Sequence, residues 1–281
     1  MNFTKMQGAG NDYIYINCFQ ETVDDPGKLA IAISDRHFGV GGDGLVLILP
    51  AITPGTDARM RIFNADGSEA EMCGNAIRCV GKYLYDHQVI RKNPLLIETL
   101  AGIKQLRLEI AEDRVVAARV DMGEPRLDPD LIPVKIPKNR IVAEPIEVNN
   151  HRYLFTGVSM GNPHCVIFVP EITAAMIHQD GPALEVHPLF PRKTNVEFVR
   201  VISKELLEMR VWERGSGETM ACGTGACAAA VAAMLNNLTA DAVKVKLRGG
   251  DLFVEWERST GHVFMTGPAV EVFQGKWPGN Q

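Results

Sequence analysis

The chain has 281 residues, of which 46% are hydrophobic and 22% are charged, and its formal net charge is −5. This length allows one large or two ordinary domains, and the composition is that of an ordinary globular protein. The charge balance provides no basic surface for nucleic acid, and no apolar run is long enough to span a membrane. The first residues also lack the basic and apolar regions of a secretory signal. We therefore expect a cytoplasmic protein with neither nucleic acid nor membrane as a partner.

Short apolar or alternating runs, which are typical of strands, cover most of the chain. They predict strands at Gly44–Leu49, Met60–Phe63, Lys104–Ile110, Val115–Met122, Tyr153–Ser159, Cys165–Val169, Asn195–Val201, Leu207–Trp212, Val243–Leu247, Leu252–Trp256 and Val263–Thr266. Helical patterns are few: one covers Gly27–His37, one runs from about Cys73 to His87, and one runs from Cys222 to Leu238. The last is apolar on every side, which indicates a helix that is buried all round.

An internal repeat relates the two halves of the chain. The first copy reads Met60-Arg-Ile-Phe and continues to Cys73-Gly, and the second reads Met209-Arg-Val-Trp and continues to Cys222-Gly. The offset is 149 for both pairs (209 minus 60, and 222 minus 73). At an offset of 151, Gly10-Asn11 resembles Gly161-Asn162, and Gly44-Leu-Val-Leu falls against Asn195-Val-Glu-Phe. A frame shared by several segments favours gene duplication over chance.

The repeat and the strand patterns together predict an α/β protein of the α+β kind. We expect two pseudo-symmetric domains, each a mostly antiparallel sheet wrapped around a central helix. The first domain is predicted at residues 1–124, with a C-terminal strand at 268–276 as a candidate to complete it, and the second at residues 125–267. The segment Gly123–Asn150, rich in proline and charge, holds the predicted boundary.

Each cysteine of the repeat precedes a glycine and opens a helix, where unpaired backbone N–H groups and the positive end of the helix dipole lie. We expect this environment to lower the pKa of Cys73 and Cys222, since the thiolate is the useful base. The N–H groups can also hold a carboxylate and stabilise charge that develops on it. They belong to Gly74, Asn75, Gly223 and Thr224. One Cys-Gly pair alone would favour a structural role, but two opposed thiols suit the transfer of a proton from one face of a carbon to the other.

Polar residues lie beside each cysteine at matching positions of the repeat. Asn64 and Glu213 end equivalent strands, and Arg214 follows directly. Strand ends that run into loops are where site residues tend to lie. The other candidates are three asparagines on or next to apolar strands and one histidine that could accept or hold a thiol proton: Asn11, Asn162, Asn195 and His164.

The remaining cysteines and glycines indicate no further chemistry. Cys18, Cys79, Cys165 and Cys227 lie among apolar neighbours and are expected to be small buried hydrophobic residues. The six cysteines are too sparse for a disulfide framework, and none has the spacing of zinc ligands. The glycine-rich segment 39–44 fits a dinucleotide-binding pattern, but a helical pattern precedes it and a strand follows, which is the reverse of the required context. We expect no metal and no cofactor.

At these residues the chain resembles the diaminopimelate epimerase family, and the resemblance covers nearly its whole length. The signatures are Asn64-Ala-Asp-Gly-Ser-x-Ala-x-Met-Cys73-Gly-Asn-Ala-x-Arg78, Gly161-Asn162-Pro-His164 and Glu213-Arg214-Gly-x-Gly-Glu-Thr-x-Ala-Cys222-Gly-Thr-Gly. The related proline racemases share both Cys-Gly sites but typically have His after the first pair, where this chain has Asn75.

The resemblance implies a cofactor-independent interconversion of LL- and meso-diaminopimelate in bacterial lysine biosynthesis, in a cleft between two domains of like fold, and commonly a homodimer. It implies that Cys73 and Cys222 are the acid–base pair. One takes the α-proton as thiolate while the other delivers a proton to the opposite face. His164 and Glu213 resemble residues that assist the thiols or hold the reacting amino acid. The matches to substrate-binding positions are Asn11, Asn64, Asn162, Asn195 and Arg214.

One position departs from the family pattern. Some members carry Gln where this chain has Gly44, and that Gln contacts the substrate. We expect the same reaction here, with an altered affinity.

Three alternatives remain open. A PhzF-like isomerase shares the fold, although such proteins generally lack the cysteine pair. A racemase for another amino acid would be identified by a substrate panel. A non-enzymatic redox-sensing or binding protein could form a regulatory Cys73–Cys222 disulfide, and entry of solvent deuterium into the substrate would separate catalysis from binding. We also expect oxidation to join the two thiols if a closed cleft brings them together, which mass spectrometry would test.

Overall fold

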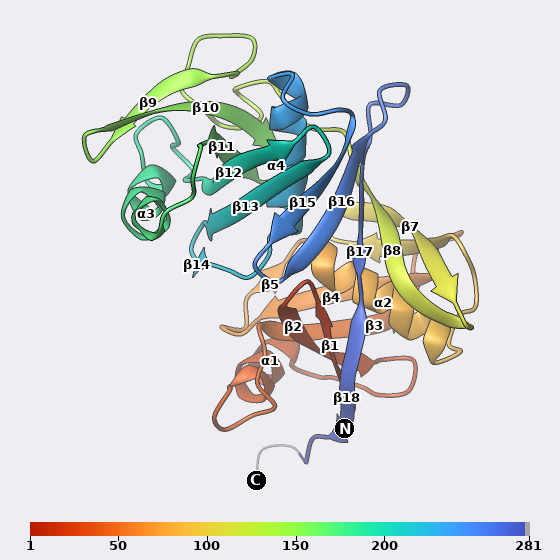
Figure 1. Cartoon of the computed structure of the whole chain (residues 1–281). Helices are drawn as coiled ribbons and strands as arrows, with labels where there is room; N and C mark the ends of the chain where they lie inside the picture. The colour runs from red at the N-terminus through yellow and green to blue at the C-terminus, as the bar shows by residue number, and fades with distance from the viewer. Residues whose placement is uncertain (279–281) are drawn as a thin grey trace. The chain divides into compact units, whose positions relative to one another are not determined.

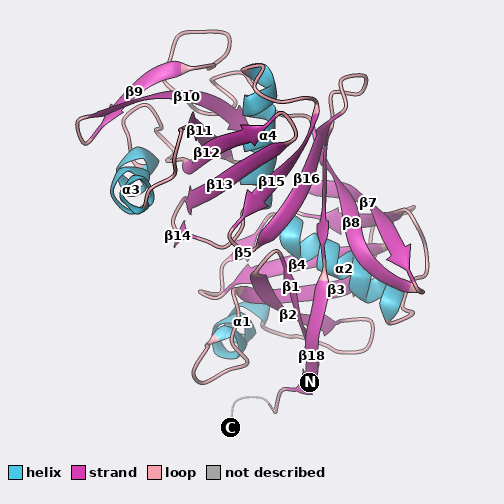
Figure 2. Ribbon diagram, viewed as in Figure 1, coloured by secondary structure: helices cyan, strands magenta, loops and turns pink. Residues whose placement is uncertain are grey.

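The computed structural model describes residues 1–278 of the chain, which divides into two compact units (Figure 1). Unit 1 comprises Met1–Asp121 together with the C-terminal segment from Thr266, and unit 2 comprises Met122–Met265. Strands dominate both units and helices are few (Figure 2), which confirms the predicted α+β class. Within the described residues, no helix is both long enough and apolar enough to cross a membrane.

Unit 1 has two helices, α1 (Pro26–Ser34) and α2 (Gly74–Asp86). Its strands are β1 (Asn2–Gly8), β2 (Asn11–Asn17), β3 (Gly44–Pro50), β4 (Ala58–Asn64), β5 (Glu69–Ala70), β6 (Leu95–Thr99), β7 (Gly102–Ala111), β8 (Arg114–Gly123) and β18 (Val270–Lys276). The C-terminal strand β18 pairs antiparallel with β1, so the last described segment of the chain belongs to the sheet that contains the first.

Unit 2 contains the π-helix η1 (Met176–Asp180), the short helix α3 (Gly181–Glu185) and the long helix α4 (Gly223–Leu235). Its strands are β9 (Glu144–Val148), β10 (His151–Ser159), β11 (Pro163–Phe168), β12 (Asn195–Ser203), β13 (Leu206–Glu213), β14 (Gly217–Glu218), β15 (Ala242–Leu247), β16 (Gly250–Trp256) and β17 (Val263–Pro268). The last strand continues a few residues beyond the boundary of the unit.

The two units repeat the same strand pairings in the same register. In unit 1, β2 pairs parallel with β3 and Tyr13 lies opposite Gly44; in unit 2, β11 pairs parallel with β12 and His164 lies opposite Asn195. Antiparallel pairs β3–β4 and β12–β13 follow, and then parallel pairs β4–β6 and β13–β15. The internal repeat therefore extends from sequence to strand register.

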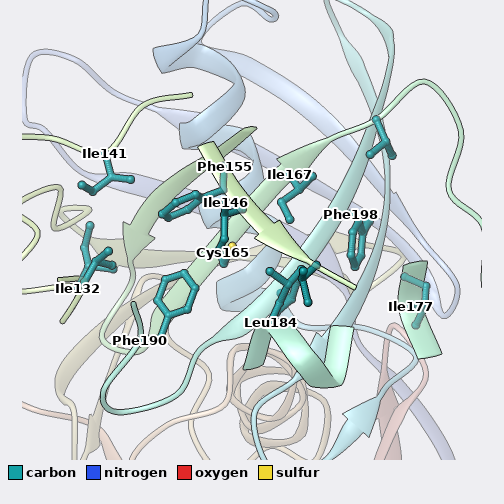
Figure 3. Packing of buried hydrophobic residues seen from close by; sticks show 14 residues of the cluster. Ile132, Ile141, Ile146, Phe155, Cys165, Ile167, Ile177, Leu184, Phe190 and Phe198 are labelled. Carbon is teal, nitrogen blue, oxygen red and sulfur yellow. The ribbon is translucent and has the colours of Figure 1, made fainter. Parts of the chain in front are cut away.

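In each unit, helices pack on both faces of the strands, because successive strand residues point to opposite sides. On β2, Ile14 and Ile16 join an apolar cluster with Ile33 of α1, whereas the Tyr15 hydroxyl lies 3.4 Å from the Ala76 carbonyl of α2. In unit 2, Cys165 of β11 lies in a core that also contains Leu184 of α3 (Figure 3). Helix α4 contacts the same strand. The prediction of buried cysteines is confirmed for Cys79, Cys165 and Cys227, none of which has exposed surface. It is wrong for Cys18, which is partly exposed just after the end of β2.

Helix α4 is enclosed as its sequence predicts. Eleven of its thirteen residues are buried, and it contacts β10, β11, β12, β13, β15 and β16. Alanine and glycine side chains allow strands to approach the helix axis on all sides, so a helix with no polar face is stable here.

Each predicted strand overlaps an observed one, but the predicted helix ends were too late. Helix α1 ends at Ser34 rather than His37, because Asp35 leaves the helical conformation and its carboxylate accepts hydrogen bonds from two following N–H groups. Helix α4 ends at Leu235, ahead of Asn237 with a φ of 55°. A left-handed residue stops a helix whatever the hydrophobic pattern beyond it.

Candidate active site

In unit 1, Cys73 lies at the junction between the β4–β5 hairpin and α2. It is the N-cap of the helix, with extended backbone angles (φ −139°, ψ 118°), and its side chain is partly exposed. Gly74 and Asn75 follow as the first helical residues, and both are buried. The first-turn N–H groups of a helix have no intrahelical acceptor, so an anion beside Cys73 would meet donors there.

A buried arginine organises the first turn of α2. Arg78 is fully buried, and its guanidinium donates to the Gly74 carbonyl (3.0 Å), the Asn75 side-chain oxygen (3.0 Å) and the Pro268 carbonyl (3.1 Å). The Asn75 side-chain nitrogen in turn donates to Asn11 Oδ1 at 2.9 Å. The structure thus brings the predicted residues Asn11, Gly74 and Asn75 together through a residue to which the sequence assigned no role.

Asn64 and Gly44 face each other at the ends of paired strands. Asn64 is exposed and its side-chain nitrogen donates to Ser68 Oγ at 3.0 Å. A Cβ atom on Gly44 would lie 2.1 Å from the Phe63 carbonyl oxygen, so this backbone has no room for any side chain at position 44. The effect of this glycine on affinity stays a prediction.

In unit 2, Cys222 occupies the equivalent N-cap position of α4. It has extended angles (φ −120°, ψ 112°) and is only 5% exposed. Its sulfur accepts a hydrogen bond from the Gly225 N–H at 3.4 Å and lies 3.4 Å from the Thr224 hydroxyl oxygen. Gly223, like Gly74 in unit 1, is the first helical residue and is buried.

The electrostatics of Cys222 differ from the sequence-based expectation of a lowered pKa. Burial raises the pKa of the Cys222 thiol well above its usual range, and the nearby carboxylates of Glu213 and Glu197 add to this rise. The hydrogen bonds from Thr224 and Gly225 act in the opposite direction and do not offset it. Cys222 is therefore a thiol at neutral pH, because helix N–H groups cannot offset desolvation together with two neighbouring carboxylates.

Glu213 and Arg214, at the end of β13, each make a hydrogen bond to a nearby residue. Glu213 is partly buried, and its carboxylate accepts a short hydrogen bond from the Thr219 hydroxyl. Arg214 is exposed, and its backbone N–H donates to Asn195 Oδ1 at 2.9 Å. Asn195 is 3% exposed and also donates to the Pro163 carbonyl at 2.9 Å. Its amide therefore binds backbone at both ends, a geometry that supports a positioning role.

His164 lies in a chain of polar groups that runs from buried Glu197 to partly exposed Asn162. Its Nδ1 is 2.7 Å from Glu197 Oε1, and its Nε2 is 2.9 Å from Asn162 Oδ1. His164 and Glu197 have no exposed surface, and the second oxygen of Glu197 is buried with no hydrogen-bond partner among the described residues. Both ring nitrogens are thus engaged away from any thiol.

Glu197 was missed by the sequence analysis. The signal was present, since a glutamate between Val196 and Phe198 interrupts an apolar strand. Its proximity to Cys222 follows from the surroundings of Gly225: a Cβ there would lie 2.8 Å from Glu197 Oε1 and 3.3 Å from Cys222 Sγ. The two atoms are therefore separated by no more than the sum of these distances.

Between residues 1 and 278, no group of three or more His, Cys, Asp or Glu side chains could hold a metal ion. The arrangement instead provides, in each unit, a cysteine at a helix start, a set of first-turn N–H groups and an asparagine amide nearby. These groups suit proton transfer beside a bound carboxylate.

Comparison with known proteins gives a consistent result. The family described as diaminopimelate epimerase matches residues 3–127 and 156–272. The diaminopimelate epimerase of Acetivibrio thermocellus is 55% identical over 98% of each chain, and that of Desulfovibrio desulfuricans is 56% identical over 99% of this chain and 98% of the relative.

Solved structures show the same fold at low identity. A probable proline racemase from Agrobacterium radiobacter K84 has a TM-score of 0.69 and 15% identity, with 99% of this chain and 93% of the other covered. A hydroxyproline epimerase from Agrobacterium vitis has a TM-score of 0.70 and 14% identity, with 98% and 90% covered.

Proposed function

The chain belongs to the diaminopimelate epimerase family and is an isomerase, and we propose that it interconverts LL- and meso-2,6-diaminopimelate by inverting one α-carbon without a cofactor. The observation that carries the proposal is the pair of cysteines at equivalent helix starts. Cys73 caps α2 and Cys222 caps α4, at matching positions of a repeat whose strand register is also preserved.

In the proposed mechanism the two thiols act on opposite faces of one α-carbon. The thiolate of one cysteine takes the α-proton, so that an S–H bond forms as the C–H bond breaks and the electron pair passes to the substrate carboxylate. The thiol of the other cysteine then gives its proton to the opposite face and becomes the thiolate. The roles reverse with the direction of reaction. The raised pKa of Cys222 supports it as the proton donor in the direction that starts with a thiol at this position.

Backbone donors support the developing negative charge. The N–H groups of Gly74, Asn75, Gly223 and Thr224 occupy the first turns of α2 and α4. Removing a single donor of this kind from an enzyme typically costs a factor of about 100 to 1,000 in kcat. Four such groups around one carboxylate would supply a large part of the barrier reduction that this reaction needs.

The remaining predicted residues have proposed roles in holding the substrate. We propose that Glu213 and Arg214, at the end of β13, pair with the ammonium and carboxylate groups of diaminopimelate. His164 acts through Asn162, which it contacts, rather than on a thiol. Asn11, Asn64 and Asn162 have proposed binding roles beside these. Asn195, which the family resemblance also marks as a binding residue, has a proposed positioning role, because its amide binds backbone groups at both ends.

Proton NMR of LL-diaminopimelate in deuterium oxide, with reducing agent and no added cofactor, tests the reaction. We expect the meso isomer to appear with deuterium at the inverted carbon. Cys73→Ala and Cys222→Ala should each abolish inversion, because each removes one of the two proton carriers. Substantial turnover by either single variant would overturn the two-thiol mechanism.

The chain offers matched controls for this test. Cys79 lies on α2 and Cys227 on α4, and both are fully buried. Cys79→Ala and Cys227→Ala therefore remove a thiol from the same helices without touching the proposed proton carriers. We expect both controls to keep their activity.

The wider setting of the reaction is part of the proposal. Inversion of LL-diaminopimelate to the meso form fits lysine biosynthesis in the bacterial cytoplasm, and we propose a homodimer. Sedimentation velocity would show a mass of about twice 30.8 kDa if the dimer forms. A monomer at working concentrations would refute it.

A further inference from the structure

Asn11 and Asn162, at equivalent positions of the repeat, each have a hydrogen-bond partner at the side-chain oxygen. Asn75 donates to Asn11 Oδ1 at 2.9 Å, and His164 Nε2 lies 2.9 Å from Asn162 Oδ1. An amide that accepts through its oxygen directs its NH₂ group the other way. Both asparagines are partly exposed, whereas their oxygens face buried partners, Asn75 and His164.

We propose that Arg78 and Glu197 are positioning residues that fix Asn11 and Asn162 as hydrogen-bond donors, so that each asparagine binds a carboxylate of the substrate rather than an ammonium. This inference rests on the proposed function, in which the substrate carries both kinds of group. Beyond that function, Asn11 and Asn162 are assigned as hydrogen-bond donors to the substrate, and Arg78 and Glu197 as the residues that orient them.

In unit 1 the direction follows from the chemistry of arginine. A guanidinium can only donate hydrogen bonds. Arg78 Nη2 lies 3.0 Å from Asn75 Oδ1, so that oxygen accepts and the Asn75 nitrogen is turned toward Asn11. Asn11 must then accept through its own oxygen. The guanidinium also donates to the Gly74 and Pro268 carbonyls, so its orientation in this series of hydrogen bonds is fixed.

In unit 2 the direction follows from the charge balance of a buried pair. Glu197 and His164 are fully buried, and together they are neutral when one proton lies between them and another lies on Nε2. Loss of the Nε2 proton would leave a buried negative charge, with one Glu197 oxygen lacking a hydrogen-bond partner in the part of the chain that the structure describes. An uncompensated buried charge is costly, so Nε2 keeps its hydrogen and donates to Asn162.

The two positioning residues, Arg78 and Glu197, do not occupy equivalent positions of the repeat. The repeat places Cys227 opposite Arg78 (227 minus 78 is 149) and Val46 opposite Glu197 (197 minus 46 is 151). The same orientation of Asn11 and Asn162 is thus reached with unrelated residues. A packing accident would not reproduce it, whereas a common requirement for a donor at both positions would.

Asn64, in unit 1, has the opposite amide orientation to Asn11. Ser68 donates its hydroxyl to Asp66 Oδ1 at 2.5 Å, so it accepts from the Asn64 nitrogen at 3.0 Å. Asn64 is therefore set with its oxygen available, which suits an ammonium group. A substrate with carboxylate and ammonium groups requires both settings.

The first experiment tests the direction of the contacts. Asn11→Asp and Asn162→Asp keep the accepting oxygen but replace the outward donor with a negative charge, while Asn11→Ala and Asn162→Ala remove the group. We expect KM for LL-diaminopimelate to rise about 10- to 100-fold in the alanine variants, from the loss of a hydrogen bond to a charged group, and further in the aspartate variants. Aspartate variants that bind as well as wild type, or better than alanine, would overturn the proposal.

The second experiment tests the positioning residues by double-mutant cycles. In Asn75→Asp, the side chain at position 75 still accepts from Arg78 but cannot donate to Asn11. The Asn11 amide should therefore rotate so that its NH₂ group faces position 75. If Asn75→Asp acts through Asn11, it should raise KM in the wild-type background and have little further effect on KM in Asn11→Ala. Glu197→Ala should behave in the same way relative to Asn162→Ala. Additive effects would mean general damage or direct repulsion and would refute the positioning role.

Two further measurements separate the possible failures. Tyr15→Phe removes a hydrogen bond to Ala76, next to Asn75 on α2, and should leave KM unchanged as the matched control. Thermal melting of every variant identifies those that fail to fold. If wild-type protein does not turn over diaminopimelate at all, the proposed function fails. If it does, and the variants show the contrary order, only this inference fails.

Discussion

The two candidate cysteines differ most at the scale of single residues. Cys222 is almost completely buried, with two carboxylates nearby, while Cys73 is partly exposed. The sequence repeat makes the two positions look alike, but burial and neighbouring charge determine the acidity of each thiol. The resting state therefore need not be symmetric even though the backbone is.

The first prediction concerns the acidity of Cys222. Glu213→Gln removes a carboxylate charge that raises the pKa of this thiol, so the pKa should fall and the thiolate fraction at a given pH should increase. We expect faster alkylation of Cys222 by iodoacetamide at pH 8, followed by site-resolved mass spectrometry. Glu205→Gln, on an exposed turn, is the control. An unchanged rate in Glu213→Gln would contradict the electrostatic account.

The second prediction concerns Gly225. An added Cβ would approach Glu197 Oε1 to 2.8 Å, and the carboxylate has no room to retreat because its strand is buried. We expect Gly225→Ala to destabilise the protein by about 1–3 kcal/mol, the usual range for overpacking. Urea unfolding measures this. A variant as stable as wild type would show that Glu197 can move.

At the scale of elements, α2 and α4 both place a cysteine at a helix start, but their buried residues differ in composition. Both begin at a cysteine cap and glycine, but α2 buries an arginine in its first turns whereas α4 buries alanines. The difference follows from what each helix meets. Arg78 finds acceptors in Gly74, Asn75 and Pro268, and α4 is enclosed by apolar strands.

The third prediction tests the enclosure of α4. Ala229 is fully buried in the middle of the helix, so Ala229→Leu must displace neighbouring strands. We expect a loss of about 1–3 kcal/mol in the free energy of unfolding. Leu235→Met is the control, because it conserves volume at the partly exposed end of the same helix. Equal stability of the two variants would contradict a tightly packed helix.

At the scale of the whole molecule, buried thiols couple stability to alkaline pH. Burial raises the pKa of Cys79 from 9.0 to about 11, and it also raises the pKa values of Cys165 and Cys222 well above their usual range. These thiols ionise near pH 9 in the unfolded chain but keep their protons in the folded one. The folded state therefore binds more protons above pH 9, and stability falls as the pH rises.

The fourth prediction follows from this linkage. The free energy of unfolding should be constant with respect to these thiols below about pH 8 and should decrease between pH 9 and pH 11. Cys79→Ala removes one contribution, so its loss over this range should be smaller by about 2 kcal/mol, from a shift of two pKa units. Urea unfolding at each pH, with a phosphine reductant, measures the difference. Parallel curves for wild type and Cys79→Ala would contradict it.

Much of the architecture could be predicted from local patterns. The strand runs and the cysteine-capped helices follow from hydrophobic periodicity, which depends only on neighbours in sequence. The helix ends could not be predicted this way. Asp35 and Asn237 end their helices through a side-chain turn and a left-handed residue, and neither changes the apolar pattern that follows.

The candidate site divides in a similar way. The paired Cys-Gly motifs and their asparagines were identified from the repeat, as was Glu213. The roles of Arg78 and Glu197 were not, because their partners lie on other elements: Arg78 reaches Pro268, 190 residues away, and Glu197 reaches His164 across a strand pair. No local pattern reports such contacts.

The sequence by itself determined the family, the repeat, the strand and helix order and the identity of the two candidate thiols, because each depends on residue types at fixed spacing. Only the tertiary structure decided which way each asparagine points and how acidic Cys222 is. Amide orientation depends on hydrogen-bond partners brought from distant segments, and a pKa depends on burial and on charges in space. Those quantities exist only once the chain has folded.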